Sequence, residues 1–416
     1  MEPKNVMIIG GGIAGMTAAQ ELAEAGLNVD LVEKSGFLGG HAIQYTCKAT
    51  SECLQCGACS VEKMLKDVVE NDKINVHLST EIESIEKNTI KKNNGYSIKV
   101  KKSAAFIDAQ KCTNCGICYD KLKENNVILQ GYSKNNTPLY AINTSKIDEN
   151  KIALKEVCPE GAISVSDKAS SENLTADAVV VATGFTPFDP NRKSVYGYDK
   201  FPNVISGLDL ERIKRQKGFL ARPSDGAEVQ KVAFIQCVGS RDENLGNLWC
   251  SQVCCPYALR TAESLKHQNP DLDITIFYMD IQNIGKSFPV FYESCKNDIR
   301  FIRSIPVDIF PVENDNLNMR LFDEAEGTPA MEEFDMVVLS IGIMPNSENE
   351  KLSAQLNIAL DSDGFFANSD VLDQTSTSND GMFIAGTAQG PKSIAASMAQ
   401  AGQAASGVLK YVGVTK

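Results

Sequence analysis

The stretch Val6-Met7-Ile8-Ile9-Gly10-Gly11-Gly12-Ile13-Ala14-Gly15 decides the fold. Four apolar residues lead into a Gly-x-Gly-x-x-Gly sequence, whose glycines permit a tight turn, close approach of the backbone to a pyrophosphate, and close packing of a helix on a strand. Residues 13–25 have the Ala, Leu and Glu content of a helix, and a second apolar strand at residues 29–32 ends at Glu33. The pattern predicts a strand–helix–strand unit that binds a dinucleotide, with Glu33 accepting hydrogen bonds from the ribose hydroxyls.

Further strand-plus-glycine elements favour FAD over NAD as that dinucleotide. Gly39-Gly40 lies just after Glu33, and similar elements occur at residues 181–184 and 384–386, as in flavoproteins with two dinucleotide-binding domains. A helix that begins near Ser393 would direct its positive end at the isoalloxazine ring. We expect the FAD site to be lined by Gly10, Gly12, Ile13, Ala14, Gly15, Glu33, Lys34, Gly39, Gly40, His41, Ile82, Ala182, Thr183, Gly184, Gly386, Thr387, Gln389, Ser393 and Ile394.

A second α/β unit begins with the apolar strand at residues 232–235, but it lacks a nicotinamide fingerprint. The chain continues Gln236-Cys237-Val238-Gly239, with a single glycine and a cysteine where the glycine turn would stand. A side chain at the first position of such a turn obstructs close approach of a pyrophosphate. We do not expect a nicotinamide nucleotide to bind there.

Twelve of the thirteen cysteines fall into three sets of four. Short Cys-x2-Cys pieces and an odd total indicate metal ligation in a reducing compartment instead of a disulfide framework. The leftover Cys295 is interpreted as a core thiol. The three candidate ligand sets are Cys47, Cys53, Cys56 and Cys59; Cys112, Cys115, Cys118 and Cys158; and Cys237, Cys250, Cys254 and Cys255.

The set that begins at Cys112 carries the strongest pattern. Its Cys-x2-Cys-x2-Cys triplet is followed by a remote Cys158-Pro159, as in bacterial ferredoxins. The position four residues after Cys118 is Leu122, so we expect one 4Fe-4S cluster and the loss of a second. Structural zinc is the alternative here.

The other two sets are less specific by spacing. The triplet Cys53, Cys56 and Cys59, with Cys47 folding back, suits a third 4Fe-4S cluster; zinc or a redox-active thiol pair would suit it as well. By chemistry alone, the set that begins at Cys237 is a possible metal site.

A resemblance sharpens the interpretation of that set. Residues 236–242 and 250–255 resemble the cluster-binding segment of the flavoprotein A subunits of heterodisulfide reductases, in which the four cysteines hold a 4Fe-4S cluster, and residues 386–392 are similar to that family's flavin-binding strand–turn–helix. The resemblance covers nearly the whole chain. It implies an oxidoreductase component that transfers electrons between FAD and iron–sulfur clusters.

The short, single-insert form looks most like the A subunit of the quinone-interacting membrane-bound oxidoreductase. That resemblance implies two partners in a complex, a second flavoprotein of the same type and a haem-containing membrane subunit. It also implies adenylylsulfate reductase as the electron partner, in a path from the menaquinone pool during sulfate respiration. The chain would then be cytoplasmic, and peripheral on the inner face of the membrane through its partners.

The expected fold is therefore α/β, with two dinucleotide-binding domains of the thioredoxin reductase type and a small ferredoxin-like α+β insert. We assign 1–105 to the first part of the FAD-binding domain, 106–168 to the insert, 169–228 to the second FAD-binding part and a connection, 229–345 to the nicotinamide-domain-like unit with a cluster motif, and 346–416 to the C-terminal FAD-binding part.

Composition narrows the function classes. The 416 residues carry a net charge of −12 without a large basic cluster, so nucleic acid is not an expected partner. No apolar run approaches the roughly 20 residues that span a bilayer, and the N-terminus lacks the pattern of a signal peptide.

No nucleophile or acid–base dyad stands out, so we assign no catalytic residue and expect the cofactors to carry the chemistry. Three alternatives stay open. One is a flavin-based electron-bifurcating subunit. Another is an NAD(P)H-dependent disulfide reductase that uses Cys53 and Cys56, or Cys56 and Cys59. The third is a scaffold stabilised by zinc.

Overall fold

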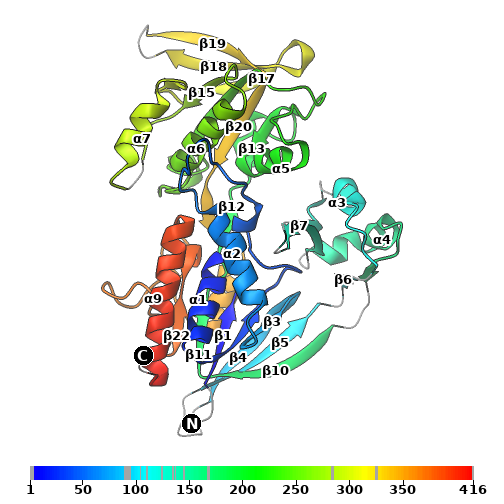
Figure 1. Cartoon of the computed structure of the whole chain (residues 1–416), viewed down its shortest axis with the longest axis vertical. Helices are drawn as coiled ribbons and strands as arrows, with labels where there is room; N and C mark the ends of the chain where they lie inside the picture. Colours follow the sequence, from blue (N-terminus) through cyan, green and yellow to red (C-terminus); the bar gives the residue numbers. More distant parts are fainter. Residues whose placement is uncertain are drawn as a thin grey trace.

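The computed structural model describes residues 4–88, 95–103, 105–108, 111–122, 125–133, 135, 137–143, 146–165, 169–282, 285–323 and 327–414. Two parallel sheets, each at the centre of an α/β unit, lie one above the other in Figure 1, with a small cysteine-rich insert beside them. Among the described residues, no helix has the length and apolar character needed to cross a membrane.

The first sheet is built from three separate parts of the chain. Its five parallel strands run in the order β22-β11-β1-β2-β3. The sheet therefore needs residues from near both ends of the chain. The strands are β1 (Asn5–Ile9), β2 (Asn28–Val32), β3 (Ile74–His77), β11 (Ala178–Val181) and β22 (Met382–Ile384).

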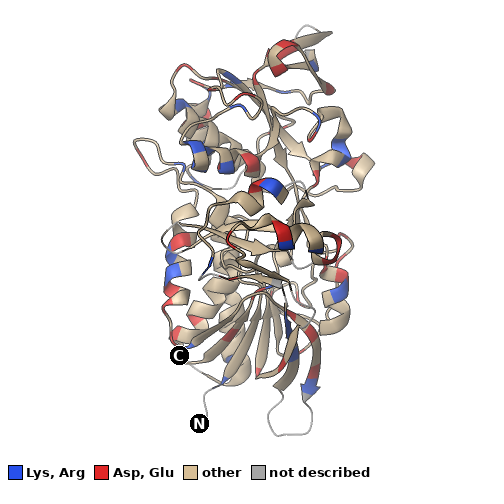
Figure 2. Ribbon diagram, turned by 90° about the vertical axis from the view of Figure 1, so that its right-hand side faces the viewer, with Lys and Arg blue, Asp and Glu red and all other residues tan. Residues whose placement is uncertain are grey.

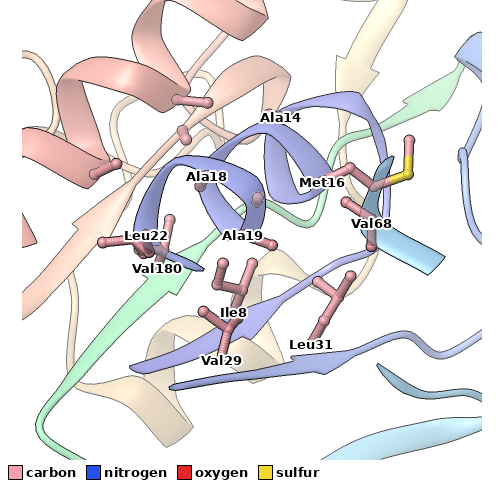
Figure 3. Close-up of a cluster of buried hydrophobic side chains, with 14 of the residues drawn as sticks. Ile8, Ala14, Met16, Ala18, Ala19, Leu22, Val29, Leu31, Val68 and Val180 are labelled. Carbon is pink, nitrogen blue, oxygen red and sulfur yellow. The ribbon is translucent and has the colours of Figure 1, made fainter. Parts of the chain in front are cut away.

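Alternation along the strands supplies both faces of this sheet with apolar side chains. On one face, Ile8 and Val180 pack against three helices (Figure 3). On the other face, Met7 and Val179 pack against an antiparallel three-stranded sheet in the order β10-β5-β4. The covering elements are α1 (Ile13–Glu24), α2 (Ala58–Val69), α9 (Ile394–Val412), β4 (Thr80–Asn88), β5 (Gly95–Lys102) and β10 (Ser170–Ala176).

The second sheet is also five-stranded and parallel, in the order β13-β20-β14-β15-β16. A three-stranded antiparallel sheet, β17-β18-β19, packs against one face. The strands and helices of the second unit are β13 (Val204–Ser206), β14 (Lys231–Val238), β15 (Asp273–Phe277), β16 (Arg300–Ile302), β17 (Asp308–Pro311), β18 (Leu317–Asp323), β19 (Thr328–Phe334), β20 (Met336–Ile341), α5 (Gly207–Lys217), α6 (Cys254–Gln268) and α7 (Phe288–Cys295).

Residues 204–217 differ from the sequence expectation. The sequence predicts a connection before residue 229, because residues 186–228 are rich in Pro, Gly and Asp. The structure has β13 and α5 there, and β13 pairs with β20, Val204 opposite Val337. A strand of three residues and a helix of largely polar composition give little apolar periodicity, so the sequence does not reveal these two elements.

The described residues of the insert form two short antiparallel strand pairs and two helices. Strand β6 (Ala105–Ile107) pairs with β9 (Ile163–Val165), and β7 (Ile128–Tyr132) pairs with β8 (Pro138–Ile142). The helices are α3 (Ile117–Leu122) and α4 (Ile147–Val157). The hairpin β7–β8 was not foreseen from the sequence. It rests on the first unit, since a Cβ added at Gly131 would lie 2.3 Å from the ring of Phe37.

The two units are joined by a pair of crossing strands. Strand β12 (Phe185–Pro187) leads from the first sheet to the second, and β21 (Ile343–Pro345) leads back. They pair antiparallel, with Thr186 opposite Met344. Helix α8 (Asn349–Leu356) follows on the return. The two connections between the first and the second unit therefore run side by side as one strand pair.

Candidate cofactor sites

The glycine turn between β1 and α1 has the shape that a pyrophosphate site requires. Gly10 has a φ of +108°, and a Cβ there would meet Ala182 O at 2.3 Å. A Cβ at Gly15 would lie 1.8 Å from Gly10 O, so the helix packs tightly on the turn. At Gly12, by contrast, no atom lies within 4 Å of an added Cβ. Two glycines close the turn, and the third leaves open space at the N-terminus of α1, where Ile13 and Ala14 begin the helix.

The second glycine pair completes one wall of this space. Gly39 N donates to Gly11 O at 2.8 Å, and a Cβ at Gly40 would lie 3.2 Å from Gly12 Cα. The ring of His41 packs on that of Phe185 with centroids 4.7 Å apart. Its Nδ1 is buried without a hydrogen-bond partner in the described structure, and burial lowers its pKa. This ring nitrogen lies beside the glycine turns and is available to form a hydrogen bond with a polar group of a ligand.

Glu33 lies at the end of β2, as predicted. Its Oε2 accepts from Gly11 N at 2.6 Å, and its Oε1 accepts from Ser35 N at 2.7 Å. Each carboxylate oxygen has a second lone pair for a ribose hydroxyl. In this structure, the same side chain also fixes the glycine turn.

The C-terminal strand brings the later glycines to the same edge of the sheet. A Cβ at Gly386 would lie 2.6 Å from Ala14 Cβ, and one at Gly184 would lie 3.9 Å from Thr387 Oγ1. The hydroxyl of Thr183 is buried and has no partner among the described residues. These elements therefore face the first glycine turn across the ends of β1, β11 and β22.

Helix α9 starts at this edge, as the sequence predicted. Ser393 Oγ accepts from Ala396 N at 3.2 Å and so caps the helix. Gln389 Oε1 accepts hydrogen bonds from Gln400 Nε2 and from Lys392 Nζ, at 2.9 and 2.7 Å. Ile394 contacts the loop that precedes α2, since a Cβ at Gly57 would lie 3.2 Å from its Cγ2.

Two of the predicted FAD residues, Lys34 and Ile82, make contacts within the protein. Lys34 forms an ion pair with Glu348 at 2.5 Å. Ile82 is 3% exposed and belongs to the core beneath the first sheet. Both lie on the first unit, so their assignment to the FAD site stays a prediction.

Sequence reasoning missed Lys392 and Asn346. Burial lowers the pKa of Lys392 to about 8. Asn346 Nδ2 donates to Thr183 O at 2.9 Å and holds the end of β11. Lys392 belongs to residues 386–392, which carry the family resemblance, so the sequence did offer a reason to include it in the site. Nothing in the sequence around Asn346 indicates a role in the site.

The four cysteines of the insert line one small cavity, together with Pro159 and Tyr140. The loop before α3 depends on Gly116, which has a φ of +78° and would place a Cβ 2.8 Å from Tyr140 Oη. Burial raises the pKa of the Cys118 thiol to about 11, and the charges of the other three cysteines act in the same direction. Ala162 N donates to Cys158 Sγ at 3.3 Å, as amides do to the sulfur ligands of clusters. The set fits a cluster bound by its four thiolates: Cys112, Cys115, Cys118 and Cys158.

The second-sheet set gathers at the C-terminal end of β14. Cys237, Cys254 and Cys255 are buried together, and Cys250 is close enough to Cys255 to influence its pKa. A hydrogen bond with Cys254, followed by burial, raises the pKa of the Cys237 thiol. Cys237 has a φ of +59°, a backbone conformation that glycine usually adopts. A cysteine thus occupies the turn in which a nicotinamide fingerprint would place glycine.

The third set is more open to solvent than the other two. Cys47, Cys53 and Cys59 are exposed and Cys56 is half-buried; the first three in sequence, Cys47, Cys53 and Cys56, lie in the loop before α2, and Cys59 lies in the first turn of that helix. Backbone amides donate to two of the sulfurs, Ala49 N to Cys47 Sγ and Gln55 N to Cys53 Sγ, both at 3.4 Å. The structure therefore does not gather these four sulfurs into one buried group.

Across all described residues, no three Cys, His, Asp or Glu side chains stand in the arrangement of a single-ion metal site. Cys295 is fully buried in the core of the second unit, as predicted.

Comparison with known proteins places this arrangement in a class. Residues 8–58 match the NAD(P)-binding Rossmann-like domain. The whole fold is similar to the thioredoxin reductases of Thermoplasma acidophilum and Lactococcus lactis, each with a TM-score of 0.55 over 99% of this chain, at 15% and 16% identity. These two structures are covered over 99% and 100% of their chains. The predicted α/β fold of the thioredoxin reductase type is confirmed. The chain therefore has the thioredoxin reductase fold, with a Rossmann-like dinucleotide-binding unit at its start.

The chain also has sequence relatives among the subunits of known reductases. The chain is 33% identical, over 96% of its length, to the A subunit of the H2:CoB-CoM heterodisulfide,ferredoxin reductase of Methanothermobacter thermautotrophicus. It is 33% identical, over 97% of its length, to the iron–sulfur A subunit of the CoB–CoM heterodisulfide reductase of Methanocaldococcus jannaschii. The chain is a homologue of the A subunits of heterodisulfide reductases, which confirms the resemblance drawn from the sequence. It spans 62% and 64% of these two relatives.

Proposed function

We propose that this chain is an FAD- and 4Fe-4S-containing electron-transfer subunit of a multisubunit oxidoreductase. The observation that carries the proposal is the contrast between its two dinucleotide-type turns. The turn at Gly10 to Gly15 leaves open space beside Gly12, whereas the corresponding turn of the second sheet carries Cys237 among three further cysteines.

The residues of the first glycine turn and of the neighbouring loops would bind FAD. Gly12, Gly39 and Gly40 leave room for the pyrophosphate, and Glu33 offers its remaining lone pairs to a ribose. FAD, when bound, can accept an electron pair and release it one electron at a time. The N-terminus of α9 and the ammonium group of Lys392 place positive charge at the flavin edge of the sheet, where negative charge would develop on reduction.

The cysteine sets supply ligands for one-electron carriers. The cavity of the insert suits one 4Fe-4S cluster and the buried cysteines at β14 suit another. The third cluster, at Cys47, Cys53, Cys56 and Cys59, rests on spacing and on two amides that donate to sulfur. Amide donors of this kind stabilise the negative charge of a reduced cluster.

The finer assignment concerns the pathway. We propose that the chain works with a second flavoprotein and a haem-containing membrane protein, and carries electrons between the menaquinone pool and adenylylsulfate reductase. It would then sit on the inner face of the cytoplasmic membrane through its partners. The resemblance of its cysteine motifs supports this assignment, as does the insert, in which Leu122 stands where a ligand of a second cluster would be.

Anaerobic purification tests the proposal directly. We expect one FAD and about eight to twelve iron atoms per chain, with matching acid-labile sulfide, since each cubane holds about four of each. NADPH should leave the flavin oxidised in anaerobic mixing. Zinc without iron, a Cys-x2-Cys disulfide, or rapid flavin reduction by NADPH would overturn it. Co-purification of the native complex, with haem quantified, tests the pathway.

A further inference from the structure

Helix α5 carries charged side chains on its buried face. Glu211 is 0% exposed and Lys214 is 7% exposed, although the helix is short and otherwise polar. Such residues are almost never fully buried unless they are paired. The helix therefore meets its neighbours through polar contacts, and several of these lead to a cysteine set.

The first contact holds the chain on both sides of Cys47. Glu211 Oε2 accepts hydrogen bonds from Thr46 N at 2.9 Å and from Thr46 Oγ1 at 2.6 Å. Glu211 Oε1 pairs with Lys48 Nζ at 2.5 Å. One carboxylate thus fixes the two residues that flank a candidate ligand.

The second contact reaches the insert beside Cys118. The guanidinium of Arg212 donates to the hydroxyl of Tyr119, and it is oriented by an ion pair with Asp209 at 2.6 Å. Three residues later, Arg215 lies over the ring of Tyr132, 3.8 Å from its centroid. Two successive arginine contacts hold α3 and β7 of the insert against α5.

The third contact reaches the helix that begins at Cys254. Tyr257 Oη donates to the carbonyl oxygen of Gly207, the first residue of α5, at 2.9 Å. Tyr257 stands three residues after Cys254, which is about 4.5 Å along the axis of α6. On the same helix, Arg260 Nε donates to Leu54 O of the Cys47 loop at 2.7 Å.

We propose that α5 is a positioning element that sets the separations between the three cysteine sets. The inference rests on the proposed function, because the separations matter only if the sets carry electrons. Electron-transfer rates fall steeply with distance. Buried ion pairs contribute little net stability, and their best-attested role is to fix register, which is the role that the Lys48–Glu211 pair would serve here.

Arg212→Ala provides the main test, with Lys217→Ala as the matched control on the exposed last turn of the same helix. Both variants and the parent are purified without oxygen, and FAD, iron and sulfide are quantified. In the fully reduced parent we expect spin–spin interaction between the insert cluster and the second-sheet cluster in the electron paramagnetic resonance spectrum. Arg212→Ala should lose that interaction with iron unchanged, and Lys217→Ala should retain it.

A conservative variant and a second measurement separate positioning from general destabilisation. Arg212→Lys keeps a donor within reach of Tyr119 and should restore part of the interaction. Hydrogen exchange reports on the Cys47 loop without any cluster, since Glu211→Gln should speed exchange at the amide of Thr46. If Glu211→Gln fails to fold, the Lys48→Met, Glu211→Met double variant replaces it.

Two outcomes have different meanings. A parent without iron or sulfide defeats the proposed function. A parent with clusters whose spectrum is unaltered by Arg212→Ala defeats the positioning role of α5, as does unchanged exchange at Thr46 in Glu211→Gln.

Discussion

Lys48 and Glu211 form an ion pair at 2.5 Å whose side chains are 3% and 0% exposed. The pair joins the loop before α2 to helix α5, and hence the first unit to the second. Removing one partner of such a pair leaves an uncompensated charge in a low-dielectric interior.

The first prediction follows from that burial. Lys48→Met should lower the free energy of unfolding by about 3–5 kcal/mol, because Glu211 is left buried and unpaired. Adding Glu211→Met should recover most of the loss. Denaturant unfolding monitored by circular dichroism measures both. A double variant no more stable than the single one would contradict the electrostatic explanation.

The second prediction concerns the glycine turn. Gly10→Ala should abolish FAD retention, because the residue has a φ of +108° and its Cβ would meet Ala182 O at 2.3 Å. Gly402→Ala is the matched control, since an added Cβ there meets nothing within 4 Å and lies in the interior of α9. Flavin absorbance per chain after gel filtration gives the answer. Full flavin content in Gly10→Ala would remove this turn from the site.

The third prediction separates ligand from core thiols. Cys254→Ser, purified without oxygen, should lose about four iron atoms per chain, the content of one cubane. Cys295→Ser should keep the iron of the parent, because Cys295 is buried in the core of the second unit. Iron and sulfide assays compare the two. Parental iron in Cys254→Ser would show that the proposed ligation is wrong.

The fourth prediction concerns pH. Burial lowers the pKa of Lys392 from 10.5 to about 8, so the unfolded chain binds more protons than the folded chain between these values. The contribution of Lys392 to the free energy of unfolding should therefore rise with pH from about 8 towards 10.5. Lys392→Met should lack that rise. The difference between parent and variant at pH 7.5 and 9.5 isolates it from buried thiols and tyrosines, and an unchanged difference would contradict the lowered pKa.

The expectations that held rested on strong local patterns. Gly10 to Gly12 join β1 to α1, Glu33 follows β2, and the insert's cysteines line one cavity. In each case, a short stretch of sequence specifies both the turn and the chemistry. Even the remote Cys158 could be predicted to lie beside the triplet, because Cys-Pro is a known partner of the triplet.

The expectations that failed depended on contacts between distant segments. Neither the pairing of β13 with β20 nor the hairpin β7–β8 leaves a periodic signal. Glu211 is polar in the sequence and buried in the fold, because its partners lie more than 160 positions away. Side-chain charge cannot predict burial when the compensating charge comes from another domain.

Charge is interspersed along the face of the molecule drawn in Figure 2, with blue and red positions mixed on both units. Attraction to a partner there would have to come from local pairs of charges, not from one extended field.

The antiparallel pairing of β12 with β21 has a consequence for how such a chain can be assembled. Pro187 lies opposite Ile343, so everything between them leaves and re-enters the first unit at one place. The insert does the same at Ala105 and Val165. Segments whose two ends lie together can be exchanged without disturbing their host. The first sheet can therefore stay intact while evolution replaces the second unit or the insert as a whole.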